Sequence, residues 1–216
     1  DAPSGVALIM VDDEGNNVIV VAPGANQKLS PDDVKKAETD IASSGAVVAQ
    51  LEVPLETIES AGKLANQSGV PFVLDPAPAR KLSPELLRMV DVLTPNETEA
   101  QILTGVEVKD HDSARAASES LLSLGVKTVI LTMGVQGFLL ADTERIEFVN
   151  ARMVEAVDST AAGDAFTGSL AVGMAQGKTL SEAASFANYV AALSVTKMGA
   201  QPSMPTLKEV EDFMNR

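Results

Sequence analysis

Short apolar runs alternate with longer amphipathic segments along most of the chain, and this alternation restricts the possible folds more than any other feature. The strand-like runs lie at 46–52, 71–75, 90–94 and 128–132, and the helix-like segments at 54–68, 83–90, 96–104 and 113–124. Strands that are separated by helices run parallel, because each helical crossover returns the chain to the same edge of the sheet. We therefore expect an α/β fold, a three-layer sandwich around a mostly parallel central sheet.

Two pairs of apolar runs have the spacing of β-hairpins instead. Runs at 5–11 and 17–22 flank the polar stretch 12–16, and a second pair lies near 138–141 and 144–149. A short polar segment between two apolar runs is a turn signal. The sequence thus predicts two hairpins.

The last quarter of the chain reads as helical. The expected helices cover 162–176, 180–197 and 207–214. An earlier helix is expected to begin where Ser30 precedes Pro31, since a capping serine followed by proline is typical of a helix start. No repeat, low-complexity tract or linker interrupts the pattern, so we expect one domain over residues 1–216.

Composition excludes several classes of function. The 216 residues carry 30 acidic and 16 Lys or Arg side chains, a formal net charge of -14, which repels nucleic acid and anionic membrane surfaces. The chain has no cysteine, so disulfides, thiolate catalysis and cysteine-ligated metals are absent. Its one histidine, His111, lies in a polar stretch and is expected to be solvated. No apolar run reaches the length of a membrane span.

The strongest motif is the segment Asp-Ser-Thr-Ala-Ala-Gly-Asp-Ala-Phe at 158–166. Small residues at the start of a helix leave backbone N–H groups open to an anion, and the helix dipole adds to the attraction. A carboxylate at Asp164 could accept a proton there. The alternative is that Asp158 and Asp164 only cap a helix.

Two other nucleotide-binding patterns fail. The segment 173–179 has three residues between its glycines where a phosphate-binding loop needs four, so Gly177 reads as a helix stop and Thr179 as a helix cap. No G-x-G-x-x-G follows a strand, which disfavours a dinucleotide-dependent oxidoreductase.

The segment 158–166 resembles the C-terminal signature of the ribokinase-like carbohydrate kinases. The resemblance implies that the backbone of Ala161, Ala162 and Gly163 forms an anion hole for the transferred phosphoryl group. It also implies that Asp164 is the catalytic base and contacts the substrate. The implied reaction is ATP-dependent phosphorylation of a sugar primary hydroxyl, with ribose as the expected acceptor and ribose 5-phosphate as the product.

Further segments resemble the nucleotide and magnesium sites of this family. The stretch 94–99 is similar to a motif that lies near the phosphates, and 131–137 is similar to the nucleotide loop. The resemblance assigns ATP to Asn96, Thr132, Gly134, Gly137 and Asn188, and Mg²⁺ to Glu99. Taken alone, the first stretch is an ordinary helix start with an acidic first turn, and the second is only a turn.

The segment 197–203 resembles the monovalent-cation loop of the family. A shell of oxygens suits a hard cation such as K⁺. The implied ligands are the side chains of Asp158 and Ser203 and the backbone carbonyls of Thr160, Ser194, Lys197 and Gly199. The alternative is a loop without a cation.

On the sugar side, Glu52 matches a residue that faces the sugar in the family, and Asp75 stands where many members carry asparagine. The resemblance begins part of the way into a typical member. The first strands of the sheet, most of the sugar-covering lid and the glycine-rich sugar motif are therefore expected outside this chain. Residues 5–22 are expected to be a remnant of the lid strands, and residues 1–216 alone to be inactive.

The resemblance also implies a cytoplasmic protein that forms a homodimer at full length. Its partners would be a small-molecule sugar and ATP, not nucleic acid or a membrane. Two alternatives within the same fold stay open: another sugar or nucleoside kinase, and a nucleotide-binding module without catalysis. They differ in whether turnover accompanies nucleotide binding.

Overall fold

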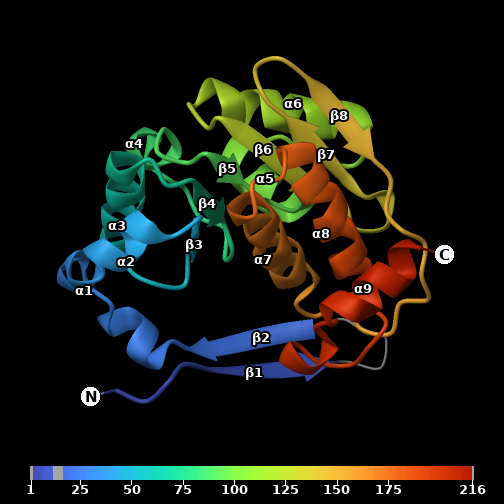
Figure 1. Cartoon of the computed structure of the whole chain (residues 1–216), viewed down its shortest axis with the longest axis horizontal. Helices are drawn as coiled ribbons and strands as arrows, with labels where there is room; N and C mark the ends of the chain where they lie inside the picture. The colour runs from blue at the N-terminus through green and yellow to red at the C-terminus, as the bar shows by residue number, and fades with distance from the viewer. Residues whose placement is uncertain (1, 12–16, 216) are drawn as a thin grey trace.

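The computed structural model describes residues 2–11 and 17–215 (Figure 1). Its strands are β1 (Val6–Val11), β2 (Asn17–Ala22), β3 (Val47–Gln50), β4 (Phe72–Asp75), β5 (Val92–Leu93), β6 (Thr128–Thr132), β7 (Phe138–Ala141) and β8 (Ile146–Val149). Its helices are α1 (Pro31–Lys36), α2 (Glu38–Ser43), α3 (Leu55–Ser68), α4 (Pro84–Leu87), α5 (Glu97–Thr104), α6 (His111–Ser123), α7 (Ala162–Ala175), α8 (Leu180–Ser194) and α9 (Leu207–Met214), with short 3₁₀ turns η1 (Gly24–Lys28), η2 (Gly134–Gln136) and η3 (Gln201–Ser203). Among the described residues, none of these helices has the length and apolarity needed to cross a membrane.

The main sheet has six strands in the order β3-β4-β5-β6-β7-β8. Strands β3 to β6 pair in parallel, and β7 and β8 are added antiparallel as the predicted hairpin. The parallel strands are apolar almost throughout, as expected for strands that are covered on both faces. The predicted mostly parallel α/β sheet is confirmed.

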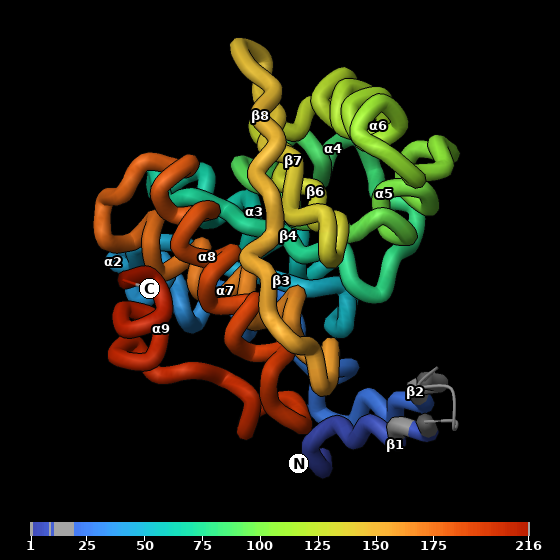
Figure 2. The backbone as a smooth tube through the Cα atoms, turned by 90° about the vertical axis from the view of Figure 1, so that its right-hand side faces the viewer, coloured from blue at the N-terminus to red at the C-terminus, as the bar shows by residue number. Residues whose placement is uncertain are grey.

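Helices cover both faces of this sheet, which gives three layers. Figure 2 shows α5 and α6 on one side of the strands and α7 and α8 on the other. Successive residues of β6 alternate between the two cores: Leu131 packs with the α3 and α6 side, and Ile130 packs with Phe166 and Leu170 of α7. The three-layer architecture predicted from the sequence is confirmed.

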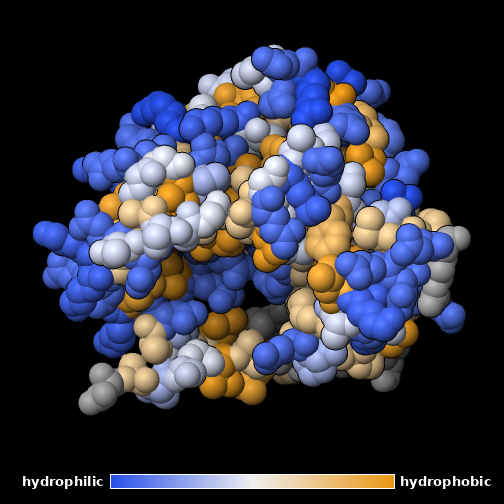
Figure 3. All heavy atoms as spheres, in the orientation of Figure 1, coloured by the Kyte–Doolittle hydropathy of each residue, from blue (hydrophilic) through white to orange (hydrophobic). Residues whose placement is uncertain are grey.

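The N-terminal strands form a separate two-stranded sheet. β1 and β2 are antiparallel, with Val6 opposite Ala22, so the predicted strand pairing is confirmed. The predicted turn at 12–16 lies outside the described residues. Val6, Leu8 and Met10 are each more than half exposed, and Figure 3 shows the molecule hollowed between this hairpin and the main body.

Several boundaries differ from the prediction. The expected strand 90–94 is only Val92–Leu93, and the expected helix 83–90 is only Pro84–Leu87. The helix expected over 180–197 ends at Ser194, and the chain then tightens: the Thr196 and Lys197 N–H groups donate to the carbonyls three residues earlier, those of Leu193 and Ser194, each at 3.2 Å.

The segment 173–179 behaves as a helix stop and a helix start, as predicted. Gly177 has φ 76° after the end of α7, and Thr179 caps α8 in a capping box with Glu182. His111 is exposed and stacks on Phe148 with ring centroids 4.1 Å apart.

Candidate active site

The start of α7 is an open helix end. Its N-cap residue, Ala161, has φ 61°, and within the described ranges it is the one non-glycine residue with positive φ. The cap offers no side-chain hydrogen bond. The Ala162 N–H donates to the Ser159 carbonyl at 3.2 Å, whereas the N–H groups of Ala161, Gly163 and Asp164 find no acceptor in the described part of the chain. These open amides and the helix dipole can bind an anion.

The backbone at Gly163 is exposed. A Cβ added to Gly163 would meet no atom within 4 Å. Of the three residues predicted to form an anion hole, Ala161 and Gly163 have open N–H groups, and Ala162 uses its own in the preceding turn. Asp164, which the sequence proposes as the base, is exposed in the first turn of α7.

The carboxylates of Asp75 and Asp164 lie close together where β3 and β4 end near the start of α7. Gln50, the last residue of β3, donates from Nε2 to Asp75 Oδ2 and to Asp164 Oδ1, each at 3.1 Å. Asp75 is the last residue of β4 and only 6% exposed. Burial, with the nearby negative charges of Glu99 and Asp164, raises the pKa of Asp75 to about 7. The sequence did not single out Gln50, although the parallel register pairs it with Asp75.

Asn96 and Glu99 form a capping box at the start of α5. The Asn96 N–H donates to Glu99 Oε2 at 2.8 Å, and the Glu99 N–H donates to Asn96 Oδ1 at 2.9 Å. These two residues therefore do form an ordinary capped helix start, the alternative that the sequence left open. Burial raises the pKa of Glu99, and the negative charge of Glu97 adds to this effect. The Oε1 atom of Glu99 makes no hydrogen bond within the described residues, so it remains open to a ligand.

The predicted nucleotide loop lies next to this helix start. Thr132 forms a parallel bridge with Asn96, and its N–H donates to the Pro95 carbonyl at 2.9 Å. Gly134 has φ 50° and open space where a Cβ would lie, which leaves the backbone accessible. At Gly137, with φ 100°, a Cβ would overlap the Val149 carbonyl, so packing against β8 already requires glycine.

Asn188 has a structural partner. Its side chain is 7% exposed, and Nδ2 donates to the Asn150 carbonyl at 2.9 Å. This bond ties α8 to the segment that follows β8. The residue predicted to border the adenine thus also fixes the backbone at that place.

The two segments of the predicted cation loop lie side by side. Asp158 joins them: Oδ1 accepts the Thr160 N–H at 2.9 Å, and Oδ2 accepts the Gly199 N–H at 2.8 Å. Hydrogen bonds from Thr160 and then from Gly199 hold the pKa of Asp158 below its usual value. Asp158 is therefore ionised and connects residues 158–160 with the loop after α8.

The predicted cation ligands differ in how free their oxygens are. The carbonyls of Thr160, Lys197 and Gly199 accept no hydrogen bond from any described residue. The Ser194 carbonyl accepts the Lys197 N–H at 3.2 Å, and Ser203 Oγ donates to the Ala200 carbonyl at 2.6 Å. The donor set is entirely oxygen, with one carboxylate, which suits a monovalent cation.

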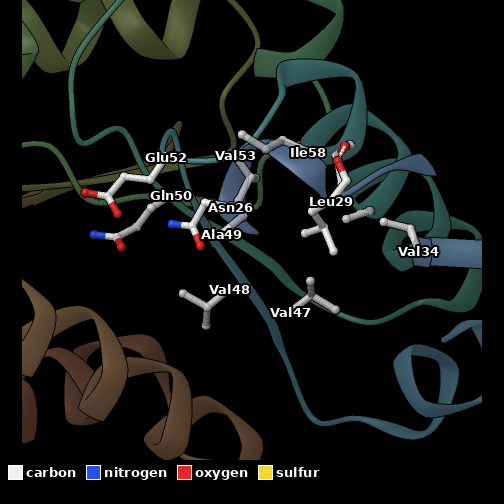
Figure 4. Close-up of a pocket in the computed structure, with 12 residues that line it drawn as sticks. Asn26, Leu29, Val34, Val47, Val48, Ala49, Gln50, Glu52, Val53 and Ile58 are labelled. Atoms are coloured by element: carbon white, nitrogen blue, oxygen red, sulfur yellow. Dashed lines mark hydrogen bonds between the residues drawn. The ribbon is translucent and has the colours of Figure 1, made fainter. Parts of the chain in front are cut away.

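Glu52 is the residue that the sequence assigns to the sugar. It is exposed just after β3 and lines, with Gln50, a hollow of about 270 Å³. Figure 4 shows the two polar side chains close together at one end of this hollow. The rest of its wall is mostly apolar and includes Leu29, Val48 and Ile58.

An open helix end above the carboxyl edge of a mostly parallel sheet, with a carboxylate in the first turn, is an arrangement suited to phosphoryl transfer. Residues 1–207 match the pfkB family carbohydrate kinases, and the chain belongs to this family. The family, the fold and the enzyme class predicted from the sequence are confirmed.

Ribokinases and a deoxyribokinase are among the proteins that this chain resembles. The chain is 44% identical over 211 residues to a ribokinase of Haemophilus influenzae, a match that covers 98% of this chain and 69% of that protein. A deoxyribokinase of Salmonella typhi is 39% identical over 213 residues, which covers 98% of this chain and 70% of that protein. A solved structure of Arabidopsis thaliana ribokinase complexed with ribose and ATP has a TM-score of 0.90 and 33% identity, and the match covers 100% of this chain and 70% of that one.

Proposed function

We propose that this protein transfers the γ-phosphoryl group of ATP to the primary hydroxyl of D-ribose and so forms ribose 5-phosphate. The similarity to several ribokinases, one of them complexed with ribose and ATP, supports this acceptor and donor. The observation that carries the proposal is the open start of α7 with an exposed carboxylate in its first turn. A helix end of this kind binds the phosphoryl group and activates the attacking hydroxyl at the same place.

In the proposed reaction the sugar hydroxyl gives its proton to Asp164 as its oxygen attacks the γ-phosphorus. The bond from that phosphorus to the bridging oxygen of ADP breaks in the same displacement. The N–H groups at 161–164 stabilise the charge on the transferred phosphoryl oxygens, which is where such a transition state needs it. Those of Ala161 and Gly163 are open for this role, and that of Ala162 becomes available if it leaves the Ser159 carbonyl.

We assign the nucleotide to the edge of the sheet beside α5. The bridge between Asn96 and Thr132 and the accessible backbone at Gly134 support this assignment. Gly137 and Asn188 then shape the backbone around the nucleotide through their packing contacts. In this arrangement the phosphates of ATP reach the start of α7.

Glu99 is the proposed residue for Mg²⁺. Its carboxylate and those of Asp75 and Asp164 bring negative charge to one region, and none of the three takes part in a salt bridge within the described residues. Such an oxygen-rich, acidic region fits a hard divalent cation. When bound, Mg²⁺ neutralises the charge on the phosphates of ATP.

The proposed K⁺ ligands are the oxygens of Asp158 and Ser203 and the carbonyls of Thr160, Ser194, Lys197 and Gly199. The free carbonyls of Thr160, Lys197 and Gly199 support this set. Bound K⁺ would order residues 158–160 and thereby the open amides that follow. Potassium should therefore activate the enzyme where sodium does so poorly, and Asp158→Ala should abolish the activation. Equal rates with and without potassium would contradict the site.

Glu52 is proposed to hold the sugar, which is supported by its exposed position beside the hollow. The family resemblance alone supports three more proposals: one kinase domain over residues 1–216, a cytoplasmic location, and a homodimer of the full-length gene product. The hairpin β1–β2, with its exposed apolar side chains, is proposed to be part of the lid.

A second candidate acceptor is 2-deoxyribose, which the identity of 39% to a deoxyribokinase favours. The test is transfer from γ-labelled ATP by the full-length gene product to ribose, deoxyribose, hexoses and nucleosides. We expect kcat/KM to be highest for ribose. A higher kcat/KM for deoxyribose or a nucleoside would make the protein a deoxyribokinase or a nucleoside kinase instead. ATP binding without transfer to any acceptor would favour a nucleotide-binding module without catalysis.

A further inference from the structure

One side-chain amide connects the proposed base to a buried carboxylate. The Nε2 atom of Gln50 lies 3.1 Å from Asp75 Oδ2 and 3.1 Å from Asp164 Oδ1. An amide NH₂ group has two N–H donors, and a carboxylate accepts in either protonation state, so the NH₂ end of Gln50 faces both partners. The three residues come from the ends of β3 and β4 and the first turn of α7, which are distant in sequence.

Among the described residues, Gln50 alone makes a hydrogen bond to the carboxylate of Asp164. An acidic residue at the third position of a helix usually turns back to the N–H of the N-cap residue. Four helices of this chain whose N-cap is Ser, Thr or Asn follow this rule, through Asp33 in α1, Glu99 in α5, Glu182 in α8 and Glu209 in α9. In α2, whose N-cap is Ala37, Asp40 at the third position makes no such bond. Asp164 makes none either, and Gln50 is the one partner of its carboxylate among the described residues.

Asp75 holds Gln50 from the opposite side. Its side chain is 6% exposed, and the strand register places it directly beside Gln50. A buried partner of fixed position restricts the rotation of the half-buried Gln50 side chain. The Oδ2 atom of Asp164 accepts no hydrogen bond from the described residues and is left for the substrate.

We propose that Gln50, held by Asp75, is a positioning residue that fixes the carboxylate of Asp164 for proton abstraction. The inference rests on the proposed function, in which Asp164 is the base. Gln50 binds one oxygen of Asp164 and directs the other toward the acceptor hydroxyl. Small errors in such a geometry reduce the rate of the chemical step much more than they weaken substrate binding.

The test is a double-mutant cycle on kcat for ribose with the full-length gene product. Gln50→Met keeps the length of the side chain and removes the donor. It should lower kcat by about tenfold to a hundredfold, with the KM for ATP within about twofold. In the Asp164→Asn background the same change should alter kcat by less than about twofold, because the carboxylate it positions is gone.

Three further variants separate positioning from folding. Asp75→Asn keeps an acceptor for Gln50 and should retain kcat within about threefold, whereas Asp75→Ala should reproduce much of the loss seen with Gln50→Met. Gln101→Met, on the exposed side of α5, is the matched control and should change neither kcat nor the melting temperature. If Gln50→Met does not fold, Gln50→Ala takes its place in the cycle.

Two results would overturn the inference while the base assignment stands: an unchanged kcat in Gln50→Met, or an equal loss in both backgrounds. Wild-type turnover in Asp164→Asn alone would mean that Asp164 is not the base. The proposed mechanism would then fail, and the positioning role of Gln50 with it.

Discussion

The starts of α7 and α8 carry the same acid pattern and differ in what the acid does. In α8, Thr179 caps the helix, and Glu182 at the third position accepts the Thr179 N–H at 2.8 Å. In α7 the N-cap is Ala161, which offers no side-chain acceptor, and Asp164 at the third position turns to Gln50. One helix start is closed by its own side chains, and the other leaves its amides and its carboxylate for a ligand.

The open start costs stability that packing must offset. A non-glycine residue in the left-handed region costs about 1 kcal/mol, and a missing cap costs about as much again. Buried contacts of Phe166 and Leu170 hold α7 on the sheet. Thr167 adds a buried hydrogen bond to Thr94, with the hydroxyl oxygens 3.0 Å apart. Local strain at a helix that is otherwise well packed is typical of a functional site.

The largest difference between the two helices should appear in turnover. Asp164→Asn should lower kcat by about a hundredfold to ten-thousandfold, the range for removal of a general base. Glu182→Gln, the matched change in α8, should leave kcat unchanged. Steady-state rates with saturating ribose and ATP measure both. Near-wild-type turnover in Asp164→Asn with the chemical step limiting would make the two helix starts equivalent.

The second-largest effect should appear in the pH dependence of stability, through Asp75 near the start of α7. The pKa of Asp75 is raised from 3.8 to about 7 in the folded protein, so the folded state binds its proton more tightly than the unfolded state. Stability from this group is therefore present below pH 3.8 and is lost as the pH rises to about 7. Above that range Asp75→Asn should be more stable than the wild type by up to about 4 kcal/mol.

Urea unfolding without nucleotide or divalent ions, at several pH values, measures this difference. The advantage of Asp75→Asn should shrink steadily toward acid pH. Glu182→Gln serves as the control, because hydrogen bonds from Thr179 lower the pKa of Glu182. Removal of this carboxylate should therefore destabilise the protein at neutral pH, and the loss should shrink toward acid pH. A constant difference between Asp75→Asn and wild type across the range would mean that Asp75 is ionised normally.

The cap of α8 should contribute stability and nothing to catalysis. Thr179→Ala should lower the free energy of unfolding by about 1 kcal/mol, since it removes the hydroxyl that accepts the Glu182 N–H. Turnover should stay at the wild-type value. Denaturant unfolding and a rate measurement on the same preparation test this. A loss of kcat at unchanged stability would show that α8 has a part in the reaction.

The smallest expected effect is a gain in stability at the start of α7, in contrast to the loss expected at the start of α8. Ala161→Gly should raise the free energy of unfolding by about 0.5–1 kcal/mol, because glycine adopts φ 61° without a steric penalty. Ala175→Gly at the last position of α7 is the control and should destabilise the protein, since no positive φ favours glycine there. Destabilisation by Ala161→Gly would contradict the strain at the open start.

Local patterns predicted most of the fold. The helix expected over 207–214 coincides with α9, and the alternation of strands and helices correctly indicated the parallel sheet. Boundaries were wrong where a helix end changes its hydrogen-bond pattern, as after Ser194, where Thr196 and Lys197 donate to the carbonyls three residues earlier. The apolar period continues through these residues and gives no sign of the change.

The sequence predicts the part of the site that one continuous motif forms. It does not predict residues that only folding brings together. The segment 158–166 is unbroken in the sequence, so its residues alone indicate a helix start with Asp164 in the first turn. Gln50 lies 114 residues from Asp164 and looks like an ordinary strand residue, so only the packing of α7 over β3 discloses it. Ala161 is equally hidden, because sequence favours the neighbouring Gly163 for a positive φ.

The central claim is that the amides at the start of α7 receive the transferred phosphoryl group. The most direct measurement is the ¹⁵N–¹H chemical shifts of the full-length gene product on addition of ADP, Mg²⁺, tetrafluoroaluminate and D-ribose. The Gly163 and Asp164 amides, which have no acceptor of their own in the described structure, should shift strongly. The Glu182 amide, already bonded to Thr179, should not move. Unchanged Gly163 and Asp164 signals in a sample that demonstrably binds the nucleotide would contradict the account.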